Sequence, residues 1–367
     1  MLKRNLLAGA AALATFWIAG SAHAQIPVAE AGPVTGEYAS LGQQMKDGAE
    51  QAVADINAHG GVLGQKLVLT TGDDACDPKQ AVSVANQLAS RGVKVVIGHF
   101  CSGSSIPASK VYADEGILEI SPGSTNPDYT DKGSWNTFRT CGRDDQQGKV
   151  AGAYIASHFE DQKIAILNDN SAYGKGLADQ TKAALNAAGV QETLYATFTP
   201  GEHDYSALVS RLKAAGISVI YIGGYHTETG LIARQTHDQG MSPTIIGGDA
   251  LMTSEFWQIA GPAGNGTLMT FAADPRKRPE AAAVVKAFHA RNIDPEGYVL
   301  YSYAALQIWA EAAAKAGTTD PQAVADVLHQ GSPWNSVLGP ISFDKKGDPT
   351  TAGYVFYVWK DGTYTQM

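Results

Sequence analysis

VVIGHFCSGSSIPAS, residues 95–109, is the stretch that decides the fold of this chain. Val95 to Gly98 form a short apolar run, which is typical of a strand covered on both faces of its sheet. The serines from Ser102 to Ser105 follow closely and belong to the residue types that start helices. A buried strand that leads into a helix through a short polar loop predicts an α/β fold with a mainly parallel sheet.

The same alternation continues on both sides of this stretch. We predict strands at 27–32, 66–71, 94–98, 117–120, 163–168, 192–198, 217–222, 244–247, 338–343 and 353–359. We predict helices at 41–59, 78–91, 103–115, 145–159, 173–189, 204–215, 226–239, 279–291, 297–316 and 320–330. One strand–helix series ends near residue 120 and a second begins near residue 163, so we expect two lobes. Strand carboxyl ends and helix amino ends should face the cleft between them.

The first 24 residues have the pattern of an export signal. Lys3 and Arg4 precede an apolar run from Leu6 to Ala19, and residues 21–24 end in the small-x-small pattern that signal peptidase cuts. The apolar run is too short to span a bilayer. We therefore expect an exported chain that starts near Gln25, with an uncleaved anchor as the alternative.

The charge balance argues against two classes of partner. Acidic side chains outnumber basic ones, 36 to 27, and give the chain a net charge of −9. Nucleic acids and anionic membrane surfaces repel an acidic chain, so we expect neither as a partner.

Common catalytic motifs are absent from the sequence. It contains no phosphate-binding loop, HExxH, CxxC or GxSxG motif. SAYGKG, residues 171–176, lacks the third glycine of a dinucleotide fingerprint. A hydrolase that used Ser102 would lack a positioned His and Asp. We expect a protein that is not an enzyme and holds no cofactor and no metal.

Two cysteines lie where they can form a disulfide. Cys76 and Cys101 each follow a predicted strand and are 25 residues apart. An oxidising compartment would let them pair, whereas three reduced, inert cysteines are the alternative. In the paired case Cys141 remains a free thiol.

Polar loops follow two of the buried strands. Ser102 begins one of them, and SPGSTNP, residues 121–127, carries Ser124 and Thr125 in the next. Such serines are often simple helix caps. Hydroxyls and the unpaired amides of a helix start also bind carboxylates, so the two loops can converge on one anion.

The second half of the chain offers complementary groups. Asp249, in GGDALMT, follows a predicted strand and is a candidate partner for an ammonium group. Tyr173 and Tyr225 lie at strand-to-helix junctions, where aromatic rings can cover an apolar side chain. Together these groups favour a small zwitterionic ligand.

Six segments closely resemble the leucine/isoleucine/valine-binding family of periplasmic receptors, and the similarity extends in order over essentially the whole mature chain. They are GAEQAVADINAHGG, DDACDPKQAVSVAN, VVIGHFCSGSSIPAS, RTCGRDDQQG, IYIGGYHTETG and YSYAALQ. The resemblance implies the type I periplasmic-binding fold, with two Rossmann-like lobes joined by three crossings. We expect residues 25–141 plus 273–338 in the first lobe and 142–272 plus 339–367 in the second.

The resemblance also implies a function and a set of site residues. We expect a monomeric periplasmic protein that binds a branched-chain or other small aliphatic amino acid and delivers it to an inner-membrane ABC permease. A sensor for an amino acid or amide is the alternative. The implied disulfide joins Cys76 and Cys101. The implied ligand-binding residues are Leu41, Phe100, Ser102, Gly123, Ser124, Thr125, Tyr173, Tyr225, Asp249 and Tyr298.

Several positions depart from the pattern of branched-chain-selective members. Those members typically carry Glu at position 249, Tyr at 41, Leu at 100 and Ala-Ala at 123–124, where this chain has Asp249, Leu41, Phe100 and Gly123-Ser124. Asp is one methylene shorter than Glu, so the ammonium must lie deeper, shift sideways or be bridged by water. Strict selectivity for leucine therefore does not follow from the resemblance.

Overall fold

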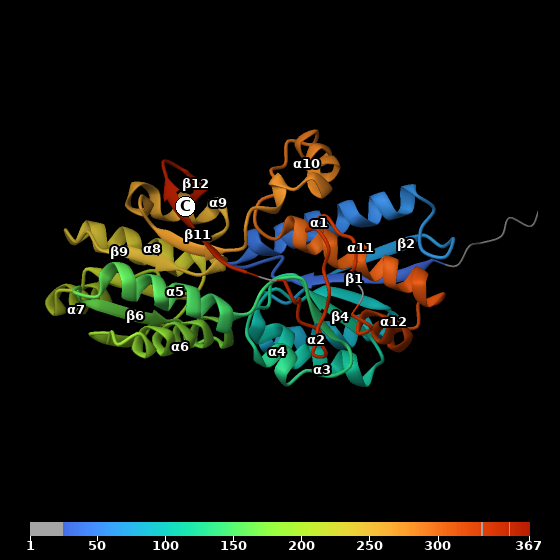
Figure 1. Ribbon diagram of the computed structural model, residues 1–367, viewed down its shortest axis with the longest axis horizontal. Helices are drawn as coiled ribbons and strands as arrows, with labels where there is room; N and C mark the ends of the chain where they lie inside the picture. Colours follow the sequence, from blue (N-terminus) through green and yellow to red (C-terminus); the bar gives the residue numbers. More distant parts are fainter. Residues whose placement is uncertain (1–24, 332, 352) are drawn as a thin grey trace, which may run out of the picture.

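Two lobes, each built around its own sheet, lie side by side in the computed structural model (Figure 1). The structure describes residues 25–331, 333–351 and 353–367. The expected export signal, residues 1–24, lies outside the described residues. Within the described part of the chain, none of the helices combines the length and apolar character that a membrane span requires.

The first lobe contains a five-stranded parallel sheet in the order β2-β1-β3-β4-β5. Its strands are β1 (Ile26–Gly32), β2 (Leu67–Asp73), β3 (Val95–Gly98), β4 (Leu118–Ser121) and β5 (Thr137–Arg139). Its helices are α1 (Ala39–Ala58), α2 (Pro78–Ser90), α3 (Ser102–Asp114), α4 (Asp128–Asp131), α10 (Ala282–His289), α11 (Val299–Ala316) and α12 (Pro321–Leu328).

Alternate side chains of these strands enter two different cores. Val28 and Ile97 belong to the core that α11 covers, whereas Ala29 and Val96 belong to the core under α2 and α3. Successive strand residues point to opposite faces, which is why a fully apolar run such as Val95 to Gly98 is needed. Figure 1 shows α1 and α11 on one side of this sheet and α2 and α3 on the other.

The second lobe contains a seven-stranded sheet in the order β12-β11-β10-β9-β8-β6-β7, parallel except at β11 and β12. Its strands are β6 (Ile164–Asn168), β7 (Leu194–Thr197), β8 (Val219–Gly223), β9 (Thr244–Gly247), β10 (Leu268–Phe271), β11 (Val355–Lys360) and β12 (Thr363–Gln366). Its helices are α5 (Asp144–Phe159), α6 (Ala172–Ala187), α7 (Ser206–Ala215), α8 (His226–Asp238) and α9 (Ser254–Ala260). The expected α/β fold with mainly parallel sheets is confirmed.

The strand predicted at 338–343 is wrong. Gly339 has a φ of +85° and Pro340 has no amide hydrogen, so the segment cannot continue a sheet. It forms only isolated bridges, Trp334 with Ile341 and Phe343 with Pro349. The prediction also missed the short elements β5, β10, β12, α4 and α9.

The chain crosses between the lobes three times, before α5, after β10 and before β11. Ile341 and Phe343 pack into the core of the first lobe. Asp348 also lies on that lobe, where it pairs with Arg139. We propose that two lobe boundaries lie near residues 141 and 272, as expected, and that the third lies beyond residue 349 rather than at 338.

Candidate functional site

A small closed space lies between the two lobes. It is lined by Phe100, Ser102, Gly123, Tyr173, Tyr225, Asp249, Ala250 and Tyr298. All of these residues are buried. The gap between their atoms is about 170 Å³ in all and leaves essentially no room for a water-sized sphere, so the side chains of the two lobes meet almost directly.

Two first-lobe loops offer hydrogen-bond donors at this space. Ser102 is the first residue of α3, and its Oγ accepts a 3.2 Å hydrogen bond from the amide of Asn126, which leaves its own hydrogen available. The hydroxyl of Thr125 is buried and has no partner within the described residues. Because a helix start also leaves amides unpaired, this side of the space suits an anion.

Phe100 and Gly123 fit together in these loops. A Cβ placed on Gly123 would lie only 2.5 Å from the Phe100 ring. The same ring meets Tyr298 nearly at right angles, with the ring centroids 4.8 Å apart. The large residue at position 100 therefore requires the small one at position 123, so these two departures from the family pattern depend on each other.

Asp249 supplies the negative charge from the second lobe. It lies just after β9, where the strand ends at the space, and is 2% exposed. Its Oδ1 accepts hydrogen bonds from Tyr173 at 2.8 Å and Gln147 at 3.1 Å, and its Oδ2 accepts one from Tyr298 at 2.6 Å. Burial raises the pKa of Asp249, and these three hydrogen bonds oppose the rise.

A second buried carboxylate belongs to Asp144, the first residue of α5. Neither of its oxygens has a hydrogen-bond partner within the described residues. Burial raises the pKa of Asp144 and the nearby charge of Asp249 adds to the rise, whereas the neighbouring Thr125 hydroxyl and the charge of Arg139 oppose it. The sequence-based prediction missed Asp144 and Gln147, because a helix start in RTCGRDDQQG gives no sign of which side chains turn inward.

Three of the predicted residues do not line the space. Leu41 is fully buried among apolar side chains. Ser124 uses its hydroxyl within the loops, 2.6 Å from Ser105 Oγ and 2.9 Å from the Phe100 carbonyl. Thr125 adjoins the lining residues, and its unpaired hydroxyl keeps it a candidate.

The cysteine pairing agrees with the expectation. Cys76 and Cys101 form a disulfide with their Cα atoms 5.6 Å apart. The bond supports the loop in front of α3, and the Tyr225 hydroxyl lies 3.7 Å from Cys76 Sγ. Cys141 is free and buried, and burial raises the pKa of its thiol, which keeps it protonated and unreactive.

Hydrogen bonds between the lobes hold the space shut. The Tyr38 hydroxyl donates to Glu228 Oε1 at 2.9 Å. Asn126 Nδ2 donates to the Ala172 carbonyl at 2.6 Å on another part of the interface. Two α/β lobes, three crossings and a buried space closed by contacts from both sides define a hinged solute-binding protein.

Comparison with known proteins agrees with this class. Residues 25–363 match the family model described as periplasmic binding protein, and the chain belongs to that family. It is 53% identical over 361 residues to Leu/Ile/Val-binding protein homolog 1 of Brucella suis, covering 98% of this chain and 97% of the relative.

Two solved structures share the fold. A leucine-binding protein of Thermotoga maritima has a TM-score of 0.87 and 24% identity, covering 93% of this chain and 97% of the other. An ABC transporter substrate-binding protein of Desulfitobacterium hafniense in complex with leucine has a TM-score of 0.77 and 29% identity, covering 94% and 100%.

Proposed function

We propose that this protein is the substrate-binding component of an ABC importer and captures a small aliphatic amino acid between its lobes. The ligand carboxylate would meet Ser102, Thr125 and the amides of Phe100 and Gly123. The ammonium group would meet Asp249 and Tyr225, and the side chain would lie among Phe100, Tyr173 and Tyr298.

One observation carries the proposal. Asp249 is buried at the space between the lobes and forms no ion pair with any described residue. Burying a charge without a counter-ion is costly, so the site is incomplete without a cation. A primary ammonium group is a cation that can donate hydrogen bonds to this carboxylate.

The lining of the space sets the range of ligands. Phe100, Tyr173 and Tyr298 bring three aromatic rings to the space. An apolar aliphatic side chain therefore suits this lining better than a charged one. The names of the relatives, which refer to leucine, isoleucine and valine, support the same class of ligand.

Capture would proceed by closure and without bond breaking. A ligand that contacts both lobes binds the closed form more tightly and shifts the hinge equilibrium toward it. We propose that the exported protein acts as a monomer in the periplasm, and that its closed form docks on an inner-membrane permease.

Isothermal titration of the purified mature protein against a panel of amino acids tests the proposal. We expect at least one small aliphatic amino acid to bind with a Kd of about 100 μM or tighter, and Asp249→Ala to abolish that binding. Absence of binding across the panel would refute the proposal, as would an Asp249→Ala variant that matches the parent. Loss of amino acid uptake after gene deletion separates the importer from a sensor.

A further inference from the structure

Arg139 is a buried cation that binds a loop of the candidate site from behind. It is the last residue of β5 and is fully buried. Its Nη1 donates to the Ser124 carbonyl at 2.6 Å, and its Nη2 donates to the Asn126 carbonyl at 3.1 Å. These two carbonyls flank Thr125, whose hydroxyl has no partner within the described residues.

The rest of the first crossing holds the same loop. The amide of Asp144 donates to the Thr125 carbonyl at 2.9 Å. The Cys141 thiol lies 3.5 Å from the Ser124 carbonyl. Residues 139–144 thus bind three successive carbonyls of the loop, so the loop and the crossing form one hydrogen-bonded unit.

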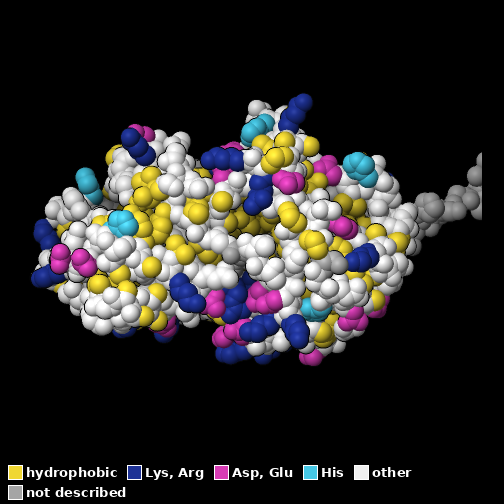
Figure 2. Space-filling model, viewed as in Figure 1, with side chains coloured by type: hydrophobic (Ala, Val, Ile, Leu, Met, Phe, Trp, Pro, Cys, Tyr) yellow, Lys and Arg dark blue, Asp and Glu magenta, His cyan; other side chains and the backbone are white. Residues whose placement is uncertain are grey.

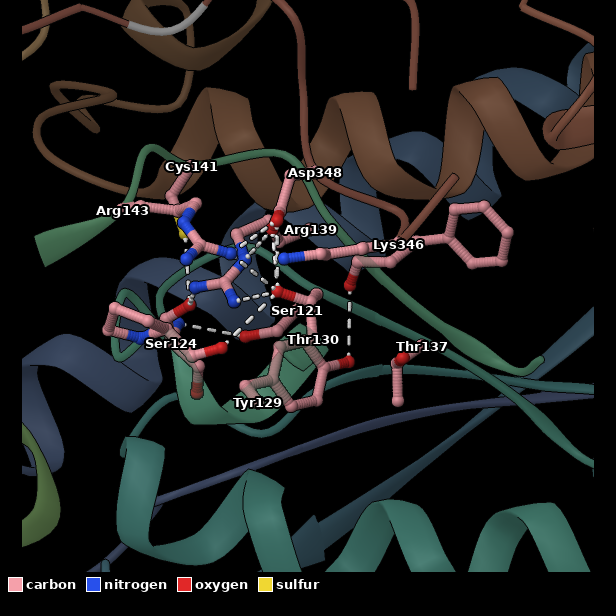
Figure 3. Close-up of polar contacts among 12 residues, drawn as sticks. Ser121, Ser124, Tyr129, Thr130, Thr137, Arg139, Cys141, Arg143, Lys346 and Asp348 are labelled. Atoms are coloured by element: carbon pink, nitrogen blue, oxygen red, sulfur yellow. Dashed lines mark hydrogen bonds and ion pairs between the residues drawn. The ribbon is translucent and has the colours of Figure 1, made fainter. Parts of the chain in front are cut away.

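Asp348, which lies on the first lobe just before the last crossing, is bound to this unit. Its Oδ1 lies 2.7 Å from Arg139 Nε, and its Oδ2 accepts a 2.6 Å hydrogen bond from Arg143. Thr130 links the groups, because its hydroxyl donates to Asp348 at 2.9 Å and accepts from Arg139 at 2.7 Å. Figure 3 shows both guanidinium groups turned toward the Asp348 carboxylate, with Ser124 and Thr130 beside them.

Around Arg139 and Asp348 lies an outer group of charged side chains that is partly exposed to water. Arg143 extends outward to Asp131 on α4, at 2.9 Å, and Lys346 reaches the same carboxylate at 2.7 Å. Charged side chains gather over α4, where the two lobes meet (Figure 2). Asp131 contacts this outer part and not Arg139, so it provides a matched control for changes at Asp348.

We propose that Arg139, fixed in place by Asp348, is a positioning residue for the ligand carboxylate. It sets residues 124–126 so that the Thr125 hydroxyl and the start of α3 face one anion. A charge-assisted bond to each flanking carbonyl gives the loop a single conformation. The inference rests on the proposed function and adds that groups at the crossings, which do not touch the ligand, control its affinity.

The test compares binding of valine and valinamide, which keeps the ammonium group and lacks the carboxylate, in four proteins. They are the parent, Asp348→Asn, Thr130→Val and the control Asp131→Asn. We expect Asp348→Asn to weaken valine binding about tenfold and valinamide binding much less. Thr130→Val should shift affinities in the same direction, and Asp131→Asn should leave both unchanged. Alanine and alaninamide replace this pair if valine does not bind.

The outcomes separate positioning from simple destabilisation. Equal weakening of valine and valinamide, or unchanged valine affinity in Asp348→Asn, would overturn the inference. If Asp348→Asn does not fold, Thr130→Val tests the same inference, because it removes a hydrogen bond to Arg139 without removing a charge. Failure of the parent protein to bind any amino acid would instead refute the proposed function.

Discussion

The hydroxyl of Tyr298 donates a 2.6 Å hydrogen bond to Oδ2 of Asp249 and thereby joins the two lobes through the candidate site. Tyr298 immediately precedes α11 of the first lobe, whereas Asp249 follows β9 of the second. Opening the lobes must break this bond. The acid that would hold a ligand's ammonium group is therefore also part of the contact that keeps the lobes closed.

Replacing Asp249 by Asn should change stability and affinity in opposite directions. The variant loses a buried charge that forms no ion pair with any described residue, so its unfolding free energy should stay the same or rise. Its amino acid affinity should fall about 100-fold or more. Thermal unfolding and titration calorimetry measure the two effects. Asp238→Asn, at an exposed position on the same lobe, is the control. A fall of both stability and affinity in Asp249→Asn would contradict the prediction.

Gly123 and Phe100 should behave as a coupled pair. Gly123→Ala places a methyl group against the ring and should destabilise the protein by about 1–3 kcal/mol. Adding Phe100→Leu should restore most of that loss, because the smaller side chain makes room. A double-mutant cycle in urea measures the coupling energy. Additive effects would show that the close approach of Gly123 and the ring does not contribute to the free energy of unfolding.

Ligand affinity should depend on pH through Glu228. Burial raises the pKa of this carboxyl from 4.5 to about 7 in the closed protein. Opening exposes the group to water and lets its pKa return toward the ordinary value, so closure takes up a proton between about pH 4.5 and 7. The contribution of Glu228 to the free energy of closure is complete below about pH 4.5 and is lost as the pH rises through 7.

Calorimetry at pH 6 in buffers of different ionisation enthalpy measures this proton uptake. The Glu228→Gln variant should take up fewer protons when it binds its ligand. Its affinity should also depend less on pH than that of the parent. Glu202→Gln, at an exposed position of the same lobe, should resemble the parent. Equal proton uptake in the parent and Glu228→Gln would exclude this carboxyl as the source.

The disulfide should stabilise the fold as well as the site. The Cys76–Cys101 bond spans 25 residues, and a closed loop of this size contributes about 3 kcal/mol by restricting the unfolded chain. The double variant Cys76→Ser/Cys101→Ser should lose that amount in urea unfolding, and reductant should shift the parent and not the variant. Identical midpoints for the parent in the presence and absence of reductant would contradict this.

Local patterns in the sequence were sufficient to predict much of the structure. Apolar runs such as Val95 to Gly98, followed by residues that start helices, predicted the parallel sheets because burial on both faces demands that composition. Asp249, Ser102 and Tyr225 were found because they follow strands, and parallel strands bring their carboxyl ends to one edge. The resemblance to a known family extended this to Phe100 and Tyr298.

Tertiary contacts decided what no local pattern contains. Asp144 and Gln147 lie at the start of α5, and only the packing of that helix turns them toward Asp249. The tight fit of Gly123 on Phe100 and the pairing of Arg139 with Asp348 join positions far apart in the chain. The sequence by itself determined most of the longer elements, because periodicity is local. The tertiary structure decided which side chains meet, because that depends on how distant segments share one buried space.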